Sequence, residues 1–348
     1  MSAVVVGEAT PSALQVLRSR FRDGKEQLLG QFRDVRASAP AAARLIRGLA
    51  KHVDLSLQDL WDHAFMPSGA ALLAVGGYGR GELFPYSDVD VLVLLPTPVH
   101  DGNGRANEAL KSAVEGFITA CWDIGLEIGS SVRTVDECLA EAQGDVTIQT
   151  ALLESRPVCG SRRLWSEFRR ASAAAMNPSS FLRAKTLEMR QRHTKYEDTP
   201  YSLEPNCKES PGGLRDLQTL IWVARAAGLG KTWGELAANG LATPFEVKQL
   251  QRNEGLLKLI RARLHVVAGR REDRLVFDLQ TAVAESFGYQ ATKAHRASEV
   301  LMRRYYWAAK AVTQLTQILL LNIEERINGS QGARMRPINE KFFDRGGM

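Results

Sequence analysis

Two aspartates stand one residue apart at the start of an apolar run. Asp88 and Asp90 open the stretch DVDVLVLL, residues 88–95. In a β-strand, residues two apart project from the same face, about 6.5–7 Å apart. Carboxylates side by side repel unless a cation lies between them, and their oxygens suit Mg²⁺ when substrate phosphates complete its shell. Because such ions hold the attacking and leaving oxygens of a phosphoryl displacement, the pair predicts metal-assisted phosphoryl transfer.

A glycine-rich turn, AVGGYGRG at residues 74–81, precedes the aspartates. Gly76 and Gly77 lack a Cβ, so backbone N–H groups there can approach a triphosphate closely, and Arg80 adds a forked donor for phosphate oxygens. The spacing fits neither a GxGxxG dinucleotide loop nor a P-loop, and the partner motifs of a kinase do not occur. Taken alone, the turn equally suits a hinge between two core strands with solvated aspartates. The paired acids favour the chemical interpretation.

A third carboxylate on a neighbouring strand would complete a metal site. Glu127 lies between Leu126 and Ile128 in LEIGSSVRT, residues 126–134, an acid between two apolar strand residues. The alternative for Glu127 is an exposed acid on an edge strand. Asp123, at the end of the preceding helix, is a less suitable candidate.

Apolar patterning predicts the elements that must position these residues. Short Val- and Leu-rich runs predict strands over 70–75, 89–95 and 126–134. Apolar spacings of three and four predict helices over 11–63, 106–125 and 291–327, and almost wholly helical structure from residue 135 onward, with breaks at 157–161, 199–213 and 228–230. We therefore expect an α+β fold with an N-terminal helical segment (1–66), a small mixed-sheet domain (67–156) and an all-helical domain (157–348).

The composition is that of a folded protein without a strongly charged surface. Of 348 residues, 45% are hydrophobic, and the net charge of +6 falls short of the basic surface expected for a nucleic-acid substrate. The four cysteines are widely spaced without a CxxC pair, so neither a zinc site nor a secreted disulfide framework is expected. The sequence shows no secretory leader and no apolar run long enough for a bilayer. We expect a cytoplasmic protein with no membrane partner.

With these residues placed, the chain resembles the polymerase-beta-like nucleotidyltransferase superfamily: Gly-Gly after one strand, Asp-x-Asp opening the next, and an acid on a later strand. More narrowly, GGYGRGELFPYSDVDVLVL (76–94) is similar to the GlnD family of uridylyltransferase/uridylyl-removing enzymes of nitrogen regulation. YSLEPNCKESPGGLRDLQTLIWVARA (201–226) matches the segment of that family between its catalytic and helical domains, and WDIGLEIGSSVRT (122–134) and RPINEKFF (336–343) match as well. The resemblance runs from about residue 18 to the end.

The resemblance implies a reaction and roles for individual residues. The reaction is transfer of UMP from UTP to a tyrosine hydroxyl of the PII signal protein, with release of diphosphate. Asp88, Asp90 and Glu127 would carry Mg²⁺, or Mn²⁺ in its place, and Glu127 would help the hydroxyl lose its proton. The triphosphate would meet Gly76, Gly77 and Ser87, with help from Arg80.

The second matching block has a physical interpretation of its own. Residues 211–213 predict a turn and 214–225 a helix, so Gly212 and Gly213 stand at an anion-receptive helix start, to which Lys208 and Arg215 add positive charge. These two cations are therefore candidate nucleotide contacts. A simple interdomain cap, with Asp216 paired to a nearby arginine, explains the pattern equally well.

The resemblance also sets expectations about regulation. Members of the family continue into an HD phosphohydrolase domain and paired ACT domains that sense glutamine, and this sequence matches neither. The His100-Asp101 dipeptide lacks the further ligands of a phosphohydrolase and is expected to be a solvated loop. We expect the chain to add UMP without removing it, and glutamine to have no effect on it.

Three other functions share part of the pattern. A glutamine synthetase adenylyltransferase has the same core and a similar GG-x-RD helix start, but the sequence of residues 201–226 favours the uridylyltransferase. A tRNA or poly(A) tailing enzyme uses the same acids, with a more basic face. A regulatory module that only binds nucleotide would gain nothing from clustered acids that repel a triphosphate.

Overall fold

The computed structural model describes residues 12–99, 107–329, 336–337 and 343–344. The chain forms two compact units. The first comprises Met1–Ala175 with Ala262–Glu272, and the second comprises Met176–Arg261 with Asp273–Met348.

The first unit is built on a four-stranded mixed sheet. Its strands are β1 (Ala71–Ala74), β2 (Val89–Leu94), β3 (Ile128–Arg133) and β4 (Arg156–Gly160), in the order β3-β2-β1-β4. β1 is antiparallel to both of its neighbours, and β2 and β3 are parallel. The predicted small mixed sheet in an α+β fold is confirmed.

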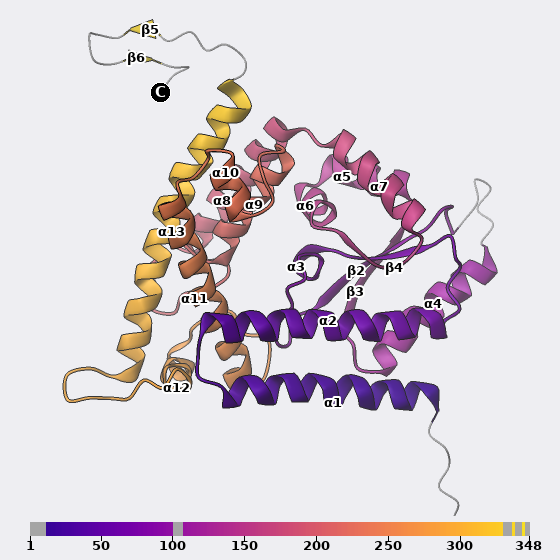
Figure 1. Cartoon of the computed structure of the whole chain (residues 1–348), viewed down its shortest axis with the longest axis horizontal. Coiled ribbons are helices and arrows are strands. Elements are labelled where there is room, and N and C mark those ends of the chain that lie inside the picture. Colours follow the sequence, from indigo (N-terminus) through magenta and orange to yellow (C-terminus); the bar gives the residue numbers. More distant parts are fainter. Residues whose placement is uncertain (1–11, 100–106, 330–335, 338–342, 345–348) are drawn as a thin grey trace, which may run out of the picture. The chain divides into compact units, whose positions relative to one another are not determined.

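Helices cover both faces of this sheet (Figure 1). Leu73, Leu92 and Leu94 project into a core shared with α5 (Val135–Gly144), α6 (Val146–Leu153) and α7 (Arg162–Ala175). On the opposite face lie α2 (Ala39–His63) and α4 (Glu108–Asp123), which meet through the edge-to-face rings of Trp61 and Phe117. The sheet is therefore enclosed, apart from its edges and strand ends, which is where polar chemistry can reach solvent.

The N-terminal helices have clear start signals. α1 (Ala13–Asp34) begins with a capping box between Ser12 and Gln15, and α2 begins after Ser38, whose hydroxyl accepts from the N–H of Ala41. A side chain at this position satisfies a backbone donor that the helix itself leaves free. The helices predicted over residues 11–63 are confirmed, as is that over 106–125, which the structure gives as α4.

The fourth strand lies where the sequence predicted none. Residues 157–161 were expected to be a break between helices, but β4 occupies Arg156–Gly160 beside β1. The strand is five residues long, contains Pro157, and shifts register against β1 between Leu72 and Leu73. Such a short, irregular edge strand has no alternating pattern by which it could be recognised.

The second unit is mainly helical. Its helices are α8 (Pro178–Lys195), α9 (Leu214–Ala226), α10 (Trp233–Ala238), α12 (Phe277–Ser286), α13 (Ala297–Asn328) and the first part of α11 (Pro244–Ala268), whose end from residue 262 belongs to the first unit. Two short strands, β5 (Arg336–Pro337) and β6 (Phe343–Asp344), pair with each other. Leu301, Tyr305 and Val312 of α13 are fully buried, which confirms the predicted long helix with one apolar face.

No helix in the described part of the chain has both the length and the apolar character needed to cross a bilayer. The domain limits at residues 66 and 156 stay a prediction, because compact units report packing and not the limits of functional modules.

Candidate functional site

Two glycines make room for the Asp90 carboxylate. β1 runs into the short helix α3 (Gly76–Gly79), where Gly76 has a φ of +56°, a conformation that residues with a Cβ avoid. A Cβ on Gly76 would stand 3.3 Å from Asp90 Oδ2, and one on Gly129 in β3 would stand 2.7 Å from Oδ1, closer than real Cβ atoms come. The glycine-rich turn and the aspartate therefore meet, and Gly129 completes the space that the carboxylate needs.

Strand register places the three predicted metal ligands on one face of the sheet. β2 and β3 are parallel with Asp90 beside Gly129, and the N–H of Val89 donates to the Glu127 carbonyl at 3.3 Å. Because side chains alternate along a strand, Asp88, Asp90 and Glu127 project to the same side. All three residues are exposed. The arrangement presents oxygen ligands to solvent at one end of the parallel strands.

These three acids suit a hard divalent cation, because all are carboxylates and all project from the same face of the sheet. Their carboxylates are not gathered around a single point. In residues 12–99 and 107–329, no three His, Cys, Asp or Glu side chains are gathered closely enough to hold a metal ion. Asp88 instead forms an ion pair with Arg271, which follows α11. Carboxylate oxygens are the ligands that Mg²⁺ prefers, and the absence of side chains at Gly76 and Gly129 leaves the Asp90 carboxylate accessible.

Arg80 is oriented by a buried carboxylate. Its Nη1 donates to both carboxylate oxygens of Glu154, at 2.7 and 2.6 Å, and the Glu154 side chain is 3% exposed. Its Nη2 stands 3.5 Å from the position that a Cβ on Gly77 would take. Arg80 is therefore held beside the glycine turn, while Glu154 already offsets part of its charge. Contact between Arg80 and phosphate stays a prediction.

A well-anchored loop carries Ser87 and Asp88 from α3 to β2. The Pro85 carbonyl accepts a hydrogen bond from Nδ1 of the buried His265, in the α11 segment of this unit. Tyr86 has a φ of +59°, which is strained for a residue with a large side chain. Because strain of about 1–3 kcal/mol persists only where the surroundings impose it, these contacts hold the loop in one conformation.

A buried network fastens α3 to the elements around it. Tyr78 is 1% exposed, and its hydroxyl donates to Asp54 of α2. Arg156 of β4 donates to the same carboxylate at 2.7 Å and lies 4.9 Å from the centroid of the Tyr78 ring. Burial raises the pKa of Tyr78, and the charge of Asp54 acts in the same direction. Tyr78 therefore stays a neutral donor that ties the glycine turn to α2 and β4.

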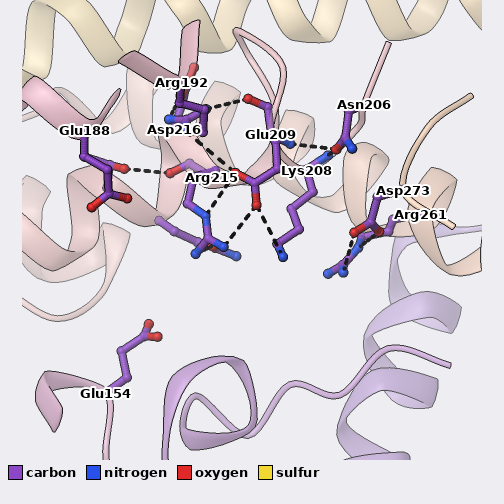
Figure 2. Close-up of polar contacts among 12 residues, drawn as sticks. Glu154, Glu188, Arg192, Asn206, Lys208, Glu209, Arg215, Asp216, Arg261 and Asp273 are labelled. Carbon is purple, nitrogen blue, oxygen red and sulfur yellow. Dashed lines mark hydrogen bonds and ion pairs between the residues drawn. The ribbon is translucent and has the colours of Figure 1, made fainter. Parts of the chain in front are cut away.

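In the second unit, Lys208 and Arg215 converge on Glu209 (Figure 2). Lys208 Nζ lies 3.3 Å and Arg215 Nη2 lies 3.1 Å from the same Glu209 oxygen. Burial lowers the pKa of Lys208, and the positive charge of Arg215 lowers it further. The two predicted cations thus lie together, with Glu209 supplying a counter-charge from the chain itself.

The N-terminus of α9 is occupied by a side chain of the same helix. The Gly212 N–H donates to Asp216 Oδ2 at 2.7 Å, and Asp216 accepts from Arg192 at 2.6 Å and from His193 at 2.9 Å. Burial alone would raise the pKa of Asp216, but the hydrogen bond from His193 and the charge of Arg192 bring it below its usual value. The predicted pairing of Asp216 with a nearby arginine is confirmed, and the Gly212 N–H donates within the chain.

Comparison with known proteins matches both regions. Residues 55–128 match the family model described as a nucleotidyltransferase domain, and residues 180–320 match that described as GlnD PII-uridylyltransferase. A bifunctional uridylyltransferase/uridylyl-removing enzyme of Cupriavidus pinatubonensis is 56% identical over 342 residues, which is 98% of this chain. The chain belongs to the GlnD family.

Other GlnD relatives agree. Proteins with the same description are 55% identical over 340 residues in Burkholderia orbicola and 53% identical over 349 residues in Burkholderia mallei. These alignments cover 97% and 100% of the chain. The chain spans only 38% of the length of the Cupriavidus and B. orbicola relatives and 39% of the B. mallei relative.

Two side chains that were not predicted contact the loop before β2. Lys25 of α1 stands 5.2 Å from the centroid of the Tyr86 ring; burial lowers its pKa, against the opposing charge of Glu127. Arg271 reaches Asp88 from 183 positions away in the sequence. Lys25 looks like any lysine on an amphipathic helix, and Arg271 lies in an ordinary charged run, so no sequence signal marks either.

Two further candidates were Asp123 and the His100-Asp101 dipeptide. Asp123 is the last residue of α4 and is exposed. His100 and Asp101 lie outside the described residues. All four cysteines are free thiols.

Proposed function

We propose that this chain transfers UMP from UTP to a tyrosine hydroxyl of a PII signal protein and releases diphosphate. The relatives are described as uridylyltransferases, and one matched model is described as a PII-uridylyltransferase. The observation that carries the proposal is the Asp90 carboxylate, which lies between Gly76 of the turn and Gly129 of β3 with Asp88 and Glu127 on the same face. The glycine-rich turn and the carboxylates thus lie at the same end of the sheet, as such a reaction requires.

Metal binding is part of this proposal. Asp88, Asp90 and Glu127 would hold Mg²⁺, or Mn²⁺ in its place, and the ion when bound would neutralise phosphate charge and orient the reacting oxygens. The remaining roles fall to the chain's own groups. Backbone N–H groups at Gly76 and Gly77, at the start of α3, would bind the triphosphate. The lack of a Cβ at both residues lets the backbone approach the phosphate oxygens closely.

Side chains around the turn would position the nucleotide and the acceptor. Ser87 lies on the anchored loop directly before Asp88. Arg80 lies beside Gly77 and is oriented by its hydrogen bonds to Glu154. An exposed carboxylate such as Glu127 could accept the proton of the acceptor hydroxyl, because such a base must lie within hydrogen-bond reach of it. Lys208 and Arg215, in the second unit, are proposed to contact the nucleotide through charges that Glu209 only partly offsets.

We further propose that the protein works in the cytoplasm on a protein acceptor and not on nucleic acid. The net charge of +6 over 348 residues is small for a polymerase that tracks a nucleic-acid backbone. The proposed partners are therefore UTP as donor and PII as acceptor.

An acceptor assay tests the function. The chain is incubated with Mg²⁺ or Mn²⁺ and labelled UTP or ATP, with PII, glutamine synthetase or RNA as acceptor. We expect label on PII from UTP, and loss of at least about 100-fold in rate for the double variant Asp88→Asn with Asp90→Asn, because transition-state charge loses its stabilisation. Asp123→Asn, which changes an exposed acid at the end of α4, is the matched control and should retain the rate.

Label on glutamine synthetase from ATP would identify an adenylyltransferase, and label on RNA a tailing enzyme. Nucleotide binding without label on any acceptor would indicate a regulatory module. Full activity of the double variant would refute the proposed site.

A further inference from the structure

The ion pair between Arg271 and Asp88 places a fixed positive charge among the proposed metal ligands. The Arg271 guanidinium pairs with Asp88 Oδ2. Both side chains are about half exposed, at 47% and 53%. Asp88 is two residues from Asp90 and projects to the same face, so Arg271 reaches the edge of the site where the triphosphate is proposed to lie.

Arg271 is carried to this place by a segment that is fastened to the first unit at two other points. Arg263 donates to the backbone carbonyls of Arg33 and Val35 at the end of α1, and His265 donates to the Pro85 carbonyl. The contacts of Arg263 and His265 are buried, so they fix the position of the segment and hold Arg271 beside Asp88. Its neighbour Arg270 pairs with Glu272 instead, at 2.8 Å.

We propose that Arg271 exchanges between two anions, holding Asp88 while no divalent cation is bound and binding the nucleotide triphosphate once a cation has replaced it at Asp88. This inference rests on the proposed nucleotidyltransferase function. It adds a triphosphate-binding residue that lies outside the glycine turn and outside the Asp-x-Asp motif.

The energetics of the pair suit such an exchange. An ion pair between half-exposed side chains is weak, because water and salt screen it. A divalent ion carries twice the charge and is shared by several oxygens, so it can displace the guanidinium from Asp88. The freed guanidinium presents a planar fork of N–H donors, which matches phosphate oxygens, and it would meet them within reach of the same carboxylates.

The exchange predicts opposite changes in two binding constants for Arg271→Gln. With Mn²⁺ alone, removal of the competing cation should tighten binding about twofold to fivefold, the range expected for an exposed pair. With UTP in the presence of saturating Mn²⁺ and without acceptor, loss of a charged phosphate contact should weaken nucleotide binding roughly tenfold or more. Mn²⁺ binding is followed by electron paramagnetic resonance, and UTP binding by calorimetry.

Matched variants separate this role from a structural one. Arg270→Gln removes the neighbouring charge and should leave both constants unchanged, whereas Arg271→Lys, which keeps the charge but not the fork, should fall between the wild type and Arg271→Gln in UTP affinity. Melting curves for all variants show whether the fold is retained. A general loosening of the unit would weaken the binding of both ligands and not shift them in opposite directions.

Two results would overturn the inference: Arg271→Gln leaving both constants at their wild-type values, or shifting both in the same direction. Failure of the proposed function looks different, because Mn²⁺ and UTP affinities would then be insensitive to Asp88→Asn with Asp90→Asn. If these affinities respond to the aspartates but not to Arg271, the function stands and the exchange is wrong.

Discussion

At the scale of single residues, the position of the Asp90 carboxylate requires a glycine at position 129. Gly129 lies beside Asp90 in the parallel register, and a Cβ would come within 2.7 Å of Oδ1. The Asp-x-Asp pattern is visible in the sequence, because its residue types and spacing are local. The need for a glycine at 129 is not, because it follows from the pairing of two strands.

Gly129→Ala should therefore impair catalysis more than folding. The added methyl group forces the Asp90 carboxylate to move, and a displacement of about 1 Å in a reacting constellation can cost around 100-fold in rate. Asp90 is exposed at the strand end, so it can move without disturbing the core, and the melting temperature should change little. Initial rates of PII labelling and thermal melts measure the two effects.

Gly116→Ala provides the matched control, since a Cβ at this position in α4 would have nothing within 4 Å. It should keep the wild-type rate and be as stable or slightly more stable, because alanine is favoured in helices. Equal rates for the two alanine variants would show that the close approach of Gly129 to Asp90 has no bearing on the reaction.

At the scale of elements, α3 is only four residues long and owes its position to its neighbours. Tyr78 ties it to Asp54 of α2, and Arg156 of β4 donates to the same carboxylate. A helix this short cannot be stable by itself, because its first hydrogen bonds do not offset the cost of nucleation. The glycine turn is therefore positioned by a helix before it in the sequence and by a strand after it.

Tyr78→Phe tests this support by removing one hydroxyl group. Loss of the buried hydrogen bond should lower the free energy of unfolding by about 1–2 kcal/mol and speed amide exchange in α3. Tyr201→Phe, at an exposed tyrosine of the second unit, should alter neither. Urea unfolding and hydrogen exchange provide the readouts, and unchanged exchange at Gly77 and Tyr78 in Tyr78→Phe would contradict the proposed support.

The sequence predicts three of the four strands around the site, because the fourth lacks a recognisable strand pattern. β1, β2 and β3 were recognisable because buried strands are short apolar runs bounded by turn residues. β4 was not, because an edge strand that contains Pro157 and pairs through an irregular register has no such run. Arg156, which begins that strand, and Glu154, just before it, were missed as well, although Arg156 lies against the Tyr78 ring and Glu154 accepts from Arg80 of the glycine turn.

At the scale of the whole molecule, the two units have separate cores, and the second one encloses charge. Asp216 is 0% exposed and lies beside Arg192 (Figure 2). It also accepts hydrogen bonds from His193 and from the Gly212 N–H at the start of α9. The sequence of this helix start suits both an anion site and a cap, because the pattern of glycines, cations and one aspartate is the same for both. The bonds from Gly212, Arg192 and His193 to Asp216 show the pairing expected of the cap. Local patterning cannot reveal these partners, since Arg192 and His193 come from α8.

The same cluster predicts how the second unit responds to acid. The folded pKa of Asp216 lies below its unfolded value of 3.8, so its stabilising contribution is fully present above about pH 4 and is lost as the pH falls through the folded pKa. Asp216→Asn removes the charge and leaves Arg192 and His193 without their anion, which should cost roughly 3–5 kcal/mol at neutral pH. In this variant, the decline of stability below pH 4 should also be shallower than in the wild type.

Hydrogen exchange resolves this effect by unit. In Asp216→Asn, amides of α8 and α9 should exchange faster at neutral pH, whereas those of β1 and β2 should keep their protection, because the first unit buries a core of its own around Leu73, Leu92 and Leu94. Glu324→Gln, at an exposed acid of α13, should leave both groups of amides unchanged. Faster exchange throughout the chain in Asp216→Asn would show that the two units open together, and an unchanged acid limb would show that Asp216 does not contribute to it.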